Sequence, residues 1–293
     1  MGPFGWAAVI GLIVFALIIA SQAIIVVQQA NRYVIERLGK YSKSLDAGIQ
    51  VVVPFVDRIT KKVSLPLHPK NDEEIVNLYA SAITKKTKVM MISHMVNITG
   101  QILPVRKICD MAHSKGVQVI VDGAHSFAHQ KYRIDELNCD YYATSLHKWL
   151  SSPLGAGFLY INKNRIKNLW PLLADGEKQL DKIKRLNHIG THPVHTDLTI
   201  NDCIDYYEMI GAERKEARMY FLQNYWTSKV RNLPRVIINT PAESSRSCGI
   251  ANIGIEGITP GDLANRLMKE HKVFTVAIDG AEVFGCRICP NVY

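Results

Sequence analysis

The sequence lacks the features of two broad classes of protein. It has 35 lysine and arginine residues and a formal net charge of +9, yet no run of five or more basic residues. Without such a run or a recognition module, the charge does not indicate nucleic-acid binding. The six cysteines are spread through apolar stretches and lack the dense spacing of a secreted disulfide scaffold. We therefore expect free thiols in a reducing compartment and no nucleic-acid partner.

The pattern of metal ligands is also sparse. Cys286 and Cys289 form a C-x-x-C pattern, but neither a second pair nor a histidine cluster accompanies it. A thioredoxin-like pair would need a helix start, whereas this stretch is an extended apolar run. The histidines at 94, 125 and 147 lie too far apart to match a short zinc motif. We expect no metal.

Charge is missing from the start of the chain. Residues 2–31 contain no charged side chain, and residues 4–27 are almost wholly apolar. As a helix rising about 1.5 Å per residue, this run exceeds the roughly 30 Å hydrocarbon core of a bilayer. Basic residues follow it, which by the positive-inside rule places the rest of the chain in the cytoplasm. We expect a single-pass transmembrane anchor over residues 1–30. A cleaved signal peptide is the alternative, which the length of the run and the lack of basic residues before it disfavour.

Residues 31–65 are typical of a small β unit. They contain "VIERLGKY" at 34–41, "LDAGI" at 45–49 and "VVPFVDRI" at 52–59. The alternation, the glycine turn and the β-branched run broken by proline predict short strands. With the apolar run before them, these motifs resemble the opening of the stomatin/prohibitin (SPFH) membrane scaffold family. The resemblance implies a scaffold fragment, although the coiled coil of that family is absent from this sequence.

From residue 66 the pattern changes to helices alternating with strands. The alternation predicts an α/β fold around a mostly parallel sheet. We expect a large domain over 66–230 and a small α+β domain over 231–293, linked by a helix near 211–225. The other predicted elements are helices at 72–84 and 106–115 and strands at 88–92, 117–121 and 141–143.

Polar residues gather where three predicted strands end, in the segments 93–100, 122–126 and 144–149. Ligands of a parallel sheet bind at the carboxyl ends of its strands. Pyridoxal 5'-phosphate would use all three segments. It needs a lysine amine, a carboxylate beside its pyridine nitrogen, and donors for its phosphate. Lys148, Asp122, and Ser145 with His147 supply these groups.

Each of these residues also has a simpler interpretation. Asp122 could cap the turn that follows it, and Lys148 taken alone would be a surface lysine. The histidines could be ordinary, partly buried side chains. The ordered set of all these groups favours the cofactor.

Longer motifs around these residues resemble the class V aminotransferases of PLP fold type I. The similarity is closest to the isopenicillin-N-epimerase-like branch, with cysteine desulfurases nearby. It implies that Lys148 forms a Schiff base with the cofactor and that Asp122 pairs with the pyridinium. The motifs are "SHMVNITGQILPV", "VIVDGAHSF", "CDYYATSLHKWL", "LGAGFLY" and "GTHPV".

The same resemblance implies further contacts. Asn97 would approach the 3-oxygen of the ring, and His125 would lie along the ring as a third catalytic residue. Ser145 and His147 would hold the phosphate. Thr191 would reach the phosphate of a neighbouring subunit, which implies a homodimer. The family's usual part before residue 66 is replaced here, so an incomplete large domain and a truncated small domain are expected.

Arg287 lies in "GCRICPN", which matches the substrate arginine of the family. A guanidinium fork suits bidentate binding of an amino-acid α-carboxylate. The alternative is a surface arginine at the end of a strand.

The cysteine positions bear on the reaction. A desulfurase needs a nucleophilic cysteine shortly before the arginine, and residues 270–285 contain none. We therefore expect transamination or epimerisation at the α-carbon of an amino acid, with Lys148 moving the proton. The alternative is a membrane-anchored, non-catalytic fusion or stomatin-like scaffold fragment that carries a remnant PLP domain.

Overall fold

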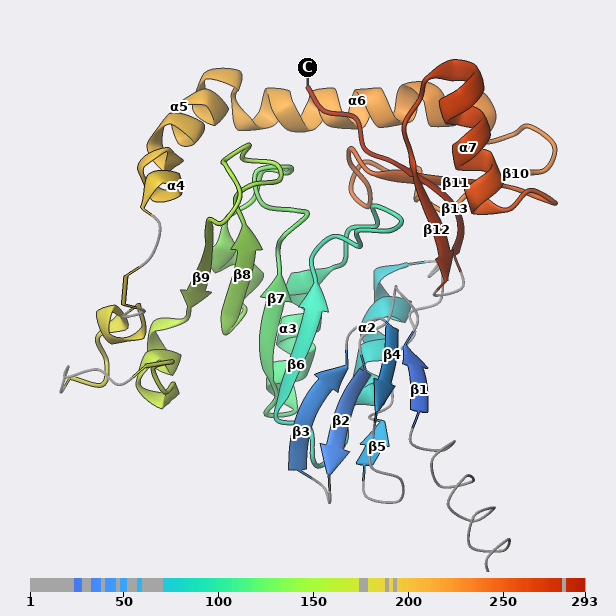
Figure 1. The fold of residues 1–293 in the computed structure, drawn as a ribbon. Coiled ribbons are helices and arrows are strands. Elements are labelled where there is room, and N and C mark those ends of the chain that lie inside the picture. Colours follow the sequence, from blue (N-terminus) through green and yellow to red (C-terminus); the bar gives the residue numbers. More distant parts are fainter. Residues whose placement is uncertain are drawn as a thin grey trace, which may run out of the picture. The chain divides into compact units, whose positions relative to one another are not determined.

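The computed structural model describes residues 71–173, 179–187, 190–191, 194–280 and 283–292, together with the backbone of five short strands before them (Figure 1). The chain divides into two compact units. The first comprises Met1–Ser64 and Asp279–Val283, and the second comprises Leu65–Ile278 and Phe284–Tyr293.

The first unit contains the predicted short strands. β1 (Ile24–Val27) pairs antiparallel with β4 (Gly48–Val51). β2 (Tyr33–Arg37) lies between β3 (Lys40–Leu45) and β5 (Asp57–Ile59), antiparallel to both. The prediction of β structure in this region is therefore confirmed.

The predicted membrane helix needs a correction at its end. Ile24–Val27 form a strand, because four consecutive β-branched residues favour extended backbone and find a partner in β4. Residues 1–23 and 28–30, the rest of the predicted anchor, lie outside the described residues. Within the described part of the chain, no helix combines the length and the apolar character that a membrane span requires.

Helix α2 (Asp72–Ala82) opens the described part of the second unit. The side chain of Asn71 accepts a hydrogen bond from the Glu74 amide at 2.9 Å, and three acidic residues occupy the first turn. Both features stabilise a helix N-terminus. Ile75 and Tyr79, one turn apart, are buried in the core. The helix therefore begins where it was predicted and ends two residues earlier than predicted.

A four-stranded sheet in the order β6-β7-β8-β9 forms the centre of this unit. Its strands are β6 (Val89–Ser93), β7 (Gln118–Asp122), β8 (Tyr141–Ser145) and β9 (Gly157–Ile161). The first three are parallel, as predicted, and β9 runs antiparallel to β8. The sheet is therefore mixed.

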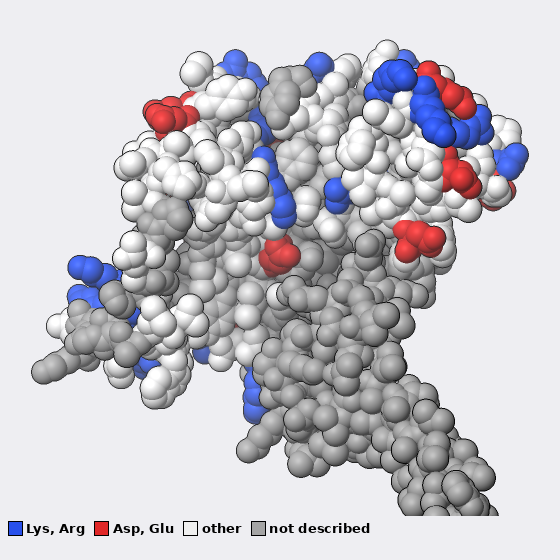
Figure 2. Space-filling view, viewed as in Figure 1, with Lys and Arg blue, Asp and Glu red and all other residues white. Residues whose placement is uncertain are grey.

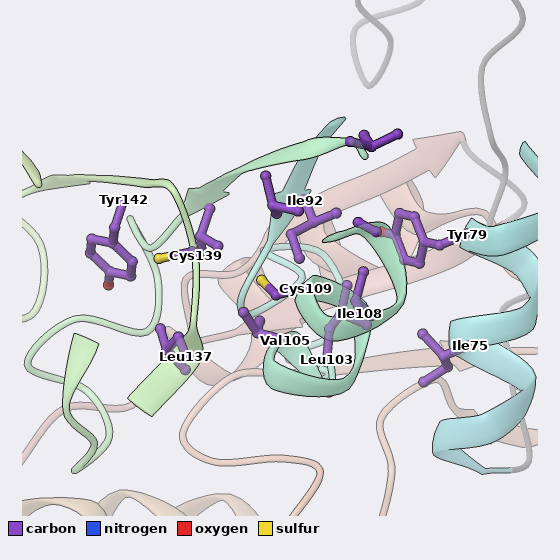
Figure 3. Packing of buried hydrophobic residues seen from close by; sticks show 14 residues of the cluster. Ile75, Tyr79, Ile92, Leu103, Val105, Ile108, Cys109, Leu137, Cys139 and Tyr142 are labelled. Carbon is purple, nitrogen blue, oxygen red and sulfur yellow. The ribbon is translucent and has the colours of Figure 1, made fainter. Parts of the chain in front are cut away.

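Helix α3 (Val105–Ser114) connects β6 to β7 and buries Ile108, Cys109 and Ala112 against the sheet. Figure 3 shows the side chains of this core gathered between the helix and the strands. Cys109 and Cys139 both belong to it, and burial raises their thiol pKa values to about 12 and about 11. All six cysteines are free, as expected.

The chain continues through η1 (Ile134–Leu137), η2 (Lys163–Asn168), η3 (Ile183–Leu186), α4 (His195–Leu198) and α5 (Ile200–Ile210). The long helix α6 (Ala212–Val230) confirms the predicted linking helix (Figure 1). A second sheet follows in the order β10-β11-β13-β12, with α7 (Pro260–His271) beside it. Its strands are β10 (Val236–Ile238), β11 (Ala251–Ile255), β12 (Val276–Gly280) and β13 (Val283–Ile288). The predicted domain boundary at 230/231 stays a prediction.

Candidate cofactor site

The three predicted polar segments meet at the carboxyl edge of the central sheet. Ser93 is the register partner of Asp122 across β6 and β7, and Asp122 is the partner of Ala143 across β7 and β8. The His94 amide donates a hydrogen bond to the Asp122 carbonyl at 2.8 Å, which extends the pairing into the loop. Figure 2 shows acidic and basic side chains near one another over this edge. The geometry predicted from the strand ends is therefore present.

The Asp122 carboxylate can both cap the following turn and bind a ligand, the two roles predicted for it. Its Oδ1 accepts a hydrogen bond from the Ala124 amide at 2.9 Å, which is the turn-capping contact. Its Oδ2 has no hydrogen-bond partner among the described residues. One oxygen therefore fixes the carboxylate, and the other is left for a ligand.

Lys148 is half-buried in the turn after β8. Burial lowers the pKa of its amine; the charge of Arg287 lowers it further, and the carboxylate of Asp122 acts in the opposite direction. Both Asp122 and Arg287 therefore act on the charge of Lys148. An amine with a lowered pKa is the nucleophilic form that attack on a carbonyl requires.

His125 lies beside the same charges. Burial, together with Lys148 and Arg287, lowers the pKa of its imidazole to about 4. The ring is therefore neutral at physiological pH. Its buried Nδ1 has no hydrogen-bond partner in the described part of the chain, and its ring centroid lies 6.5 Å from that of Trp149.

Arg287 arrives from β13, at the other end of the sequence. Its Nη1 donates a hydrogen bond to the Asn97 carbonyl oxygen at 3.2 Å, while its buried Nε has no partner within the described ranges. The structure thus joins two predicted residues, but it does so through the main chain of Asn97. The side chain of Asn97 is exposed.

The two predicted phosphate residues lie at the base of a hairpin. Ser145 pairs with Gly157 at the end of the β8–β9 ladder, and the Leu146 amide donates to the Ala156 carbonyl at 3.0 Å. His147 follows with a buried Nδ1 that forms no hydrogen bond with a described residue. Thr191 is exposed, and among the described residues no hydrogen bond or ion pair joins it to this site. Its predicted role across a dimer stays a prediction.

Two supporting residues were not found from the sequence. The His129 ring lies against Trp149, and the Lys215 amine donates a hydrogen bond to the Trp149 carbonyl. Trp149 directly follows Lys148. Lys215 lies in a strongly charged helical segment, where a lysine is expected to be exposed. The sequence therefore gives no signal that Lys215 is buried near Trp149.

The residues present fit the predicted cofactor. Asp122 and Lys148 follow neighbouring strands at one sheet edge, and Arg287 is hydrogen-bonded to Asn97 in the loop after the third strand there. Buried nitrogens of His125, His147 and Arg287 have no hydrogen-bond partner among the described residues. Buried polar atoms normally have partners, so a group of unpartnered ones points to a missing ligand. Across the described residues, no three His, Cys, Asp or Glu side chains group as metal ligands would.

Comparisons with known proteins identify the family of the chain. The aminotransferase class-V family model matches residues 56–283. A probable cysteine desulfurase of Halalkalibacterium halodurans is 30% identical over 213 residues, covering 69% of this chain and 51% of the relative. Isopenicillin N epimerase of Streptomyces clavuligerus is 29% identical over 246 residues, covering 78% and 62%. The chain thus spans less than two thirds of the length of these relatives.

A solved structure shows the same fold. The apo cysteine desulfurase of Thermococcus onnurineus NA1 superposes with a TM-score of 0.65 at 24% identity, covering 74% of this chain and 58% of that one. The family match begins at residue 56, inside the segment 31–65 that was predicted to be stomatin-like. The comparisons give the stomatin resemblance no support.

Proposed function

The chain belongs to the class V aminotransferase family, and from this we propose that it transforms an amino acid at its α-carbon, by transamination or epimerisation. Family membership confirms the predicted cofactor, pyridoxal phosphate. The observation that carries the proposal is the meeting of three groups at one sheet edge: Asp122 at the end of β7, Lys148 in the turn after β8, and Arg287 hydrogen-bonded to the loop after β6. When bound, the cofactor supplies an electron-withdrawing pyridinium ring.

Lys148 and Asp122 have complementary tasks. The Lys148 amine would hold the cofactor, and the same amine can carry a proton to or from the α-carbon of the substrate. The lowered pKa of that amine suits the task, because a general base works best with a pKa near the operating pH. The free oxygen of Asp122 would accept a hydrogen bond from the ring nitrogen of the cofactor.

The remaining residues orient the ligands. Arg287 binds the α-carboxylate of the substrate through the edge of its guanidinium that carries Nε. The neutral ring of His125 would cover the cofactor ring without adding charge. Ser145 and His147 would donate to its phosphate from the base of the hairpin. Asn97, whose carbonyl accepts a hydrogen bond from Arg287, would approach the 3-oxygen of the ring.

The test uses the purified full chain with added pyridoxal phosphate. The wild type is expected to take up the cofactor and to develop its visible absorbance band, and Lys148→Ala is expected to lose both. Lys163→Ala, which removes an exposed lysine beyond β9, serves as the control. A wild type that takes up no cofactor contradicts the proposal and favours a non-catalytic remnant.

The reaction type is tested with amino acids in deuterated water. Transamination and epimerisation both exchange the α-proton for deuterium, and epimerisation also yields the D-isomer. Amino acids that keep their α-proton in the presence of a coloured, loaded protein contradict both reactions.

Cysteine desulfuration is the second candidate, because one relative is described as a probable cysteine desulfurase. That chemistry needs a reactive thiol near the arginine. Cys248 and Cys286 are buried, and burial raises the thiol pKa of both. Cys289 is exposed; partial burial of its sulfur raises the thiol pKa, and Arg287 beside it acts in the opposite direction. The buried thiols of Cys248 and Cys286 favour chemistry at the α-carbon, and Cys289 is the exposed thiol next to Arg287 that a desulfurase would use. Sulfide release from L-cysteine that is lost in Cys289→Ser would reverse this preference.

Two proposals concern partners. We propose a homodimer, supported by exposed apolar side chains on α4 and α5, Leu198 at 75% and Met209 at 74% exposed. Sedimentation of the full chain tests it, and Met209→Glu is expected to weaken it. We also propose a membrane anchor at residues 4–23, the part of the apolar run that precedes β1, with the remainder in the cytoplasm. Flotation with vesicles tests this, and recovery of the full chain only in the soluble fraction contradicts it.

A further inference from the structure

Trp149, the residue directly after Lys148, is held at both its main chain and its side chain. Its carbonyl oxygen accepts a hydrogen bond from the amine of Lys215, which belongs to helix α6. Its indole ring lies against the imidazole of His129, with ring centroids 3.9 Å apart and planes inclined by 31°. The side chain is only 7% exposed. The main chain that carries Lys148 is therefore attached to a buried framework.

Lys215 is buried in an unusual way. It is 3% exposed, although its neighbours Glu213 and Arg214 on the same helix are exposed. A lysine that is buried without an acidic partner costs free energy, and lysines are seldom found so. Among the described residues, no ion pair joins Lys215 to a carboxylate. Its amine instead bonds the Trp149 carbonyl and lies over the ring of Tyr207, whose centroid is 5.3 Å from Nζ.

His129 completes the framework. Its Nδ1 donates to the His125 carbonyl at 2.9 Å, and its Nε2 accepts from the Gly249 amide at 2.9 Å. These two bonds fix the ring in one neutral tautomer. His129 therefore connects three parts of the chain, namely the loop of His125, the turn of Lys148 and the start of β11.

We propose that Lys215 is a positioning residue for Lys148, holding the Trp149 carbonyl so that the turn directs the Lys148 amine toward the cofactor site. This inference rests on the proposed function of Lys148. Without the Lys215 amine, a buried carbonyl would lose its donor, and the peptide after Trp149 would rotate to find another. The Lys148 side chain would then leave the turn in a less defined direction.

The charge on Lys215 gives the contact a pH dependence. Burial lowers the pKa of Lys215 to about 8, and the nearby Cys248 acts in the opposite direction. The other groups that face it do not titrate near that pH. Burial raises the pKa of Cys248 to about 12 and lowers that of His129 to about 3, and burial raises the pKa of Tyr207 above 10.0. Above pH 8 the Lys215 amine loses its proton and its hydrogen bond to Trp149 weakens, because charge-assisted bonds are about twice as strong as neutral ones.

The experiment measures the Lys148 amine directly, in the full chain without cofactor. Lys148 is labelled with limiting acetic anhydride at a series of pH values, and the extent of labelling is read by peptide mass spectrometry. In Lys215→Met, the pH at which Lys148 is half labelled is expected to rise by roughly 1 pH unit, because the Lys148 amine becomes more exposed to solvent. In the wild type, the profile is expected to show a second inflection near pH 8 that Lys215→Met removes.

Two further variants control the result. Lys215→Arg keeps a charged donor and is expected to restore the wild-type midpoint. Lys229→Met removes a lysine from the exposed face of the same helix and is expected to change nothing. Cofactor affinity provides a second readout, with about a tenfold loss expected in Lys215→Met, as for loss of one charged hydrogen bond.

The outcomes separate this inference from the proposed function. The inference is overturned if Lys215→Met folds and its Lys148 is labelled with the same pH dependence as in the wild type. It is also overturned if labelling of the wild type shows no inflection near pH 8, a result that does not depend on the folding of any variant. A wild type that takes up no cofactor overturns the proposed function alone, because the labelling is done in its absence.

Discussion

Arg287 donates a hydrogen bond through Nη1 to the main-chain carbonyl of Asn97, 3.2 Å away. The two residues lie 190 positions apart in the sequence. The bond occupies one nitrogen of the guanidinium and leaves the buried Nε without a partner among the described residues. The arginine is thus anchored on one side and available on the other.

Arg287→Lys is expected to raise the KM for an amino-acid substrate by about 30- to 100-fold, since it keeps the charge but loses the bidentate fork, a change of about 2–3 kcal/mol. Cofactor uptake is expected to stay unchanged, because Arg287 is assigned to the substrate. Steady-state kinetics and a cofactor titration measure the two effects. Arg266→Lys, on the exposed face of α7, is the control, and an unchanged KM would contradict the assignment.

Gly100 lies where the loop after β6 meets the residue before β11. A Cβ at this position would stand 2.0 Å from the Ile250 carbonyl oxygen, and φ is +73°. Gly100→Ala is expected to destabilise the fold by about 3 kcal/mol or more, since it combines left-handed strain with a backbone clash.

Gly116→Ala is the matched control, because Gly116 has nearly the same φ, +71°, but open space around it. Gly116→Ala is expected to lower the free energy of unfolding by about 1 kcal/mol, the cost of the left-handed backbone strain without a clash. Urea denaturation compares the two, and equal losses would show that the close approach to Ile250 is not rigid.

The buried histidines predict a loss of stability in mild acid. Burial lowers the pKa values of His94, His125 and His129 from 6.5 to about 4, about 4 and about 3. Between pH 6.5 and 4 the unfolded chain therefore binds more protons than the folded chain, and stability falls as the pH falls. With nearly three protons taken up on unfolding at pH 5, the slope is roughly 4 kcal/mol per pH unit.

Urea denaturation at pH 7, 6 and 5 measures this slope. His125→Gln is expected to reduce it by about a third, because one of the three buried imidazoles is removed. The same replacement at the exposed His195 should leave the slope unchanged. Stability that is constant over this range would contradict the burial of the three rings.

Asp140 predicts a second, more acidic transition. Burial alone would raise the pKa of this carboxyl, but hydrogen bonds from His113, the Val119 amide and Arg165 outweigh it and lower the pKa below 3.8. The stabilisation is therefore complete above pH 3.8 and is lost as the pH falls through the lower, folded value.

Asp140→Asn is expected to cost about 3 kcal/mol at pH 7, because it removes the buried charge that Arg165 faces at 2.6 Å. Asp135→Asn alters an exposed ion pair with Arg133 and is expected to cost well under about 1 kcal/mol. Urea denaturation distinguishes them, and equal small losses would show that the Asp140 contacts do not stabilise the fold.

Much of the central fold could be predicted from local pattern. The strand predicted at 117–121 is observed at Gln118–Asp122, and the helix predicted at 106–115 is observed at Val105–Ser114. Both have a clear apolar period and clear boundaries. β9 was not predicted as a strand, because its residues are extended through pairing with β8 and not through their own pattern. The strand at Ile24–Val27 was missed because the apolar run around it suggests a helix.

Some residues of the candidate site could be predicted from the sequence and others could not. Lys148, Asp122 and Arg287 could be found because their residue types and order match one chemistry. Lys215 and His129 could not, because their role depends on contacts over 66 and 120 positions of sequence. Contacts between residues so far apart cannot be recognised from neighbouring residues in the sequence. The charged residues around Lys215 also predict an exposed side chain, whereas the observed one is buried.

The antiparallel return of β9 has a consequence for how this family can vary. Ser145 pairs with Gly157, and the Leu146 amide bonds the Ala156 carbonyl, so both ends of the intervening segment are fixed side by side. Within that segment, the Ser152 amide donates a hydrogen bond to the Leu146 carbonyl at 3.3 Å, which closes an inner turn around Lys148, and the exposed tip at 153–155 follows this turn. Insertions at the tip can therefore lengthen the loop, and bring new groups toward a substrate, without moving the reactive lysine.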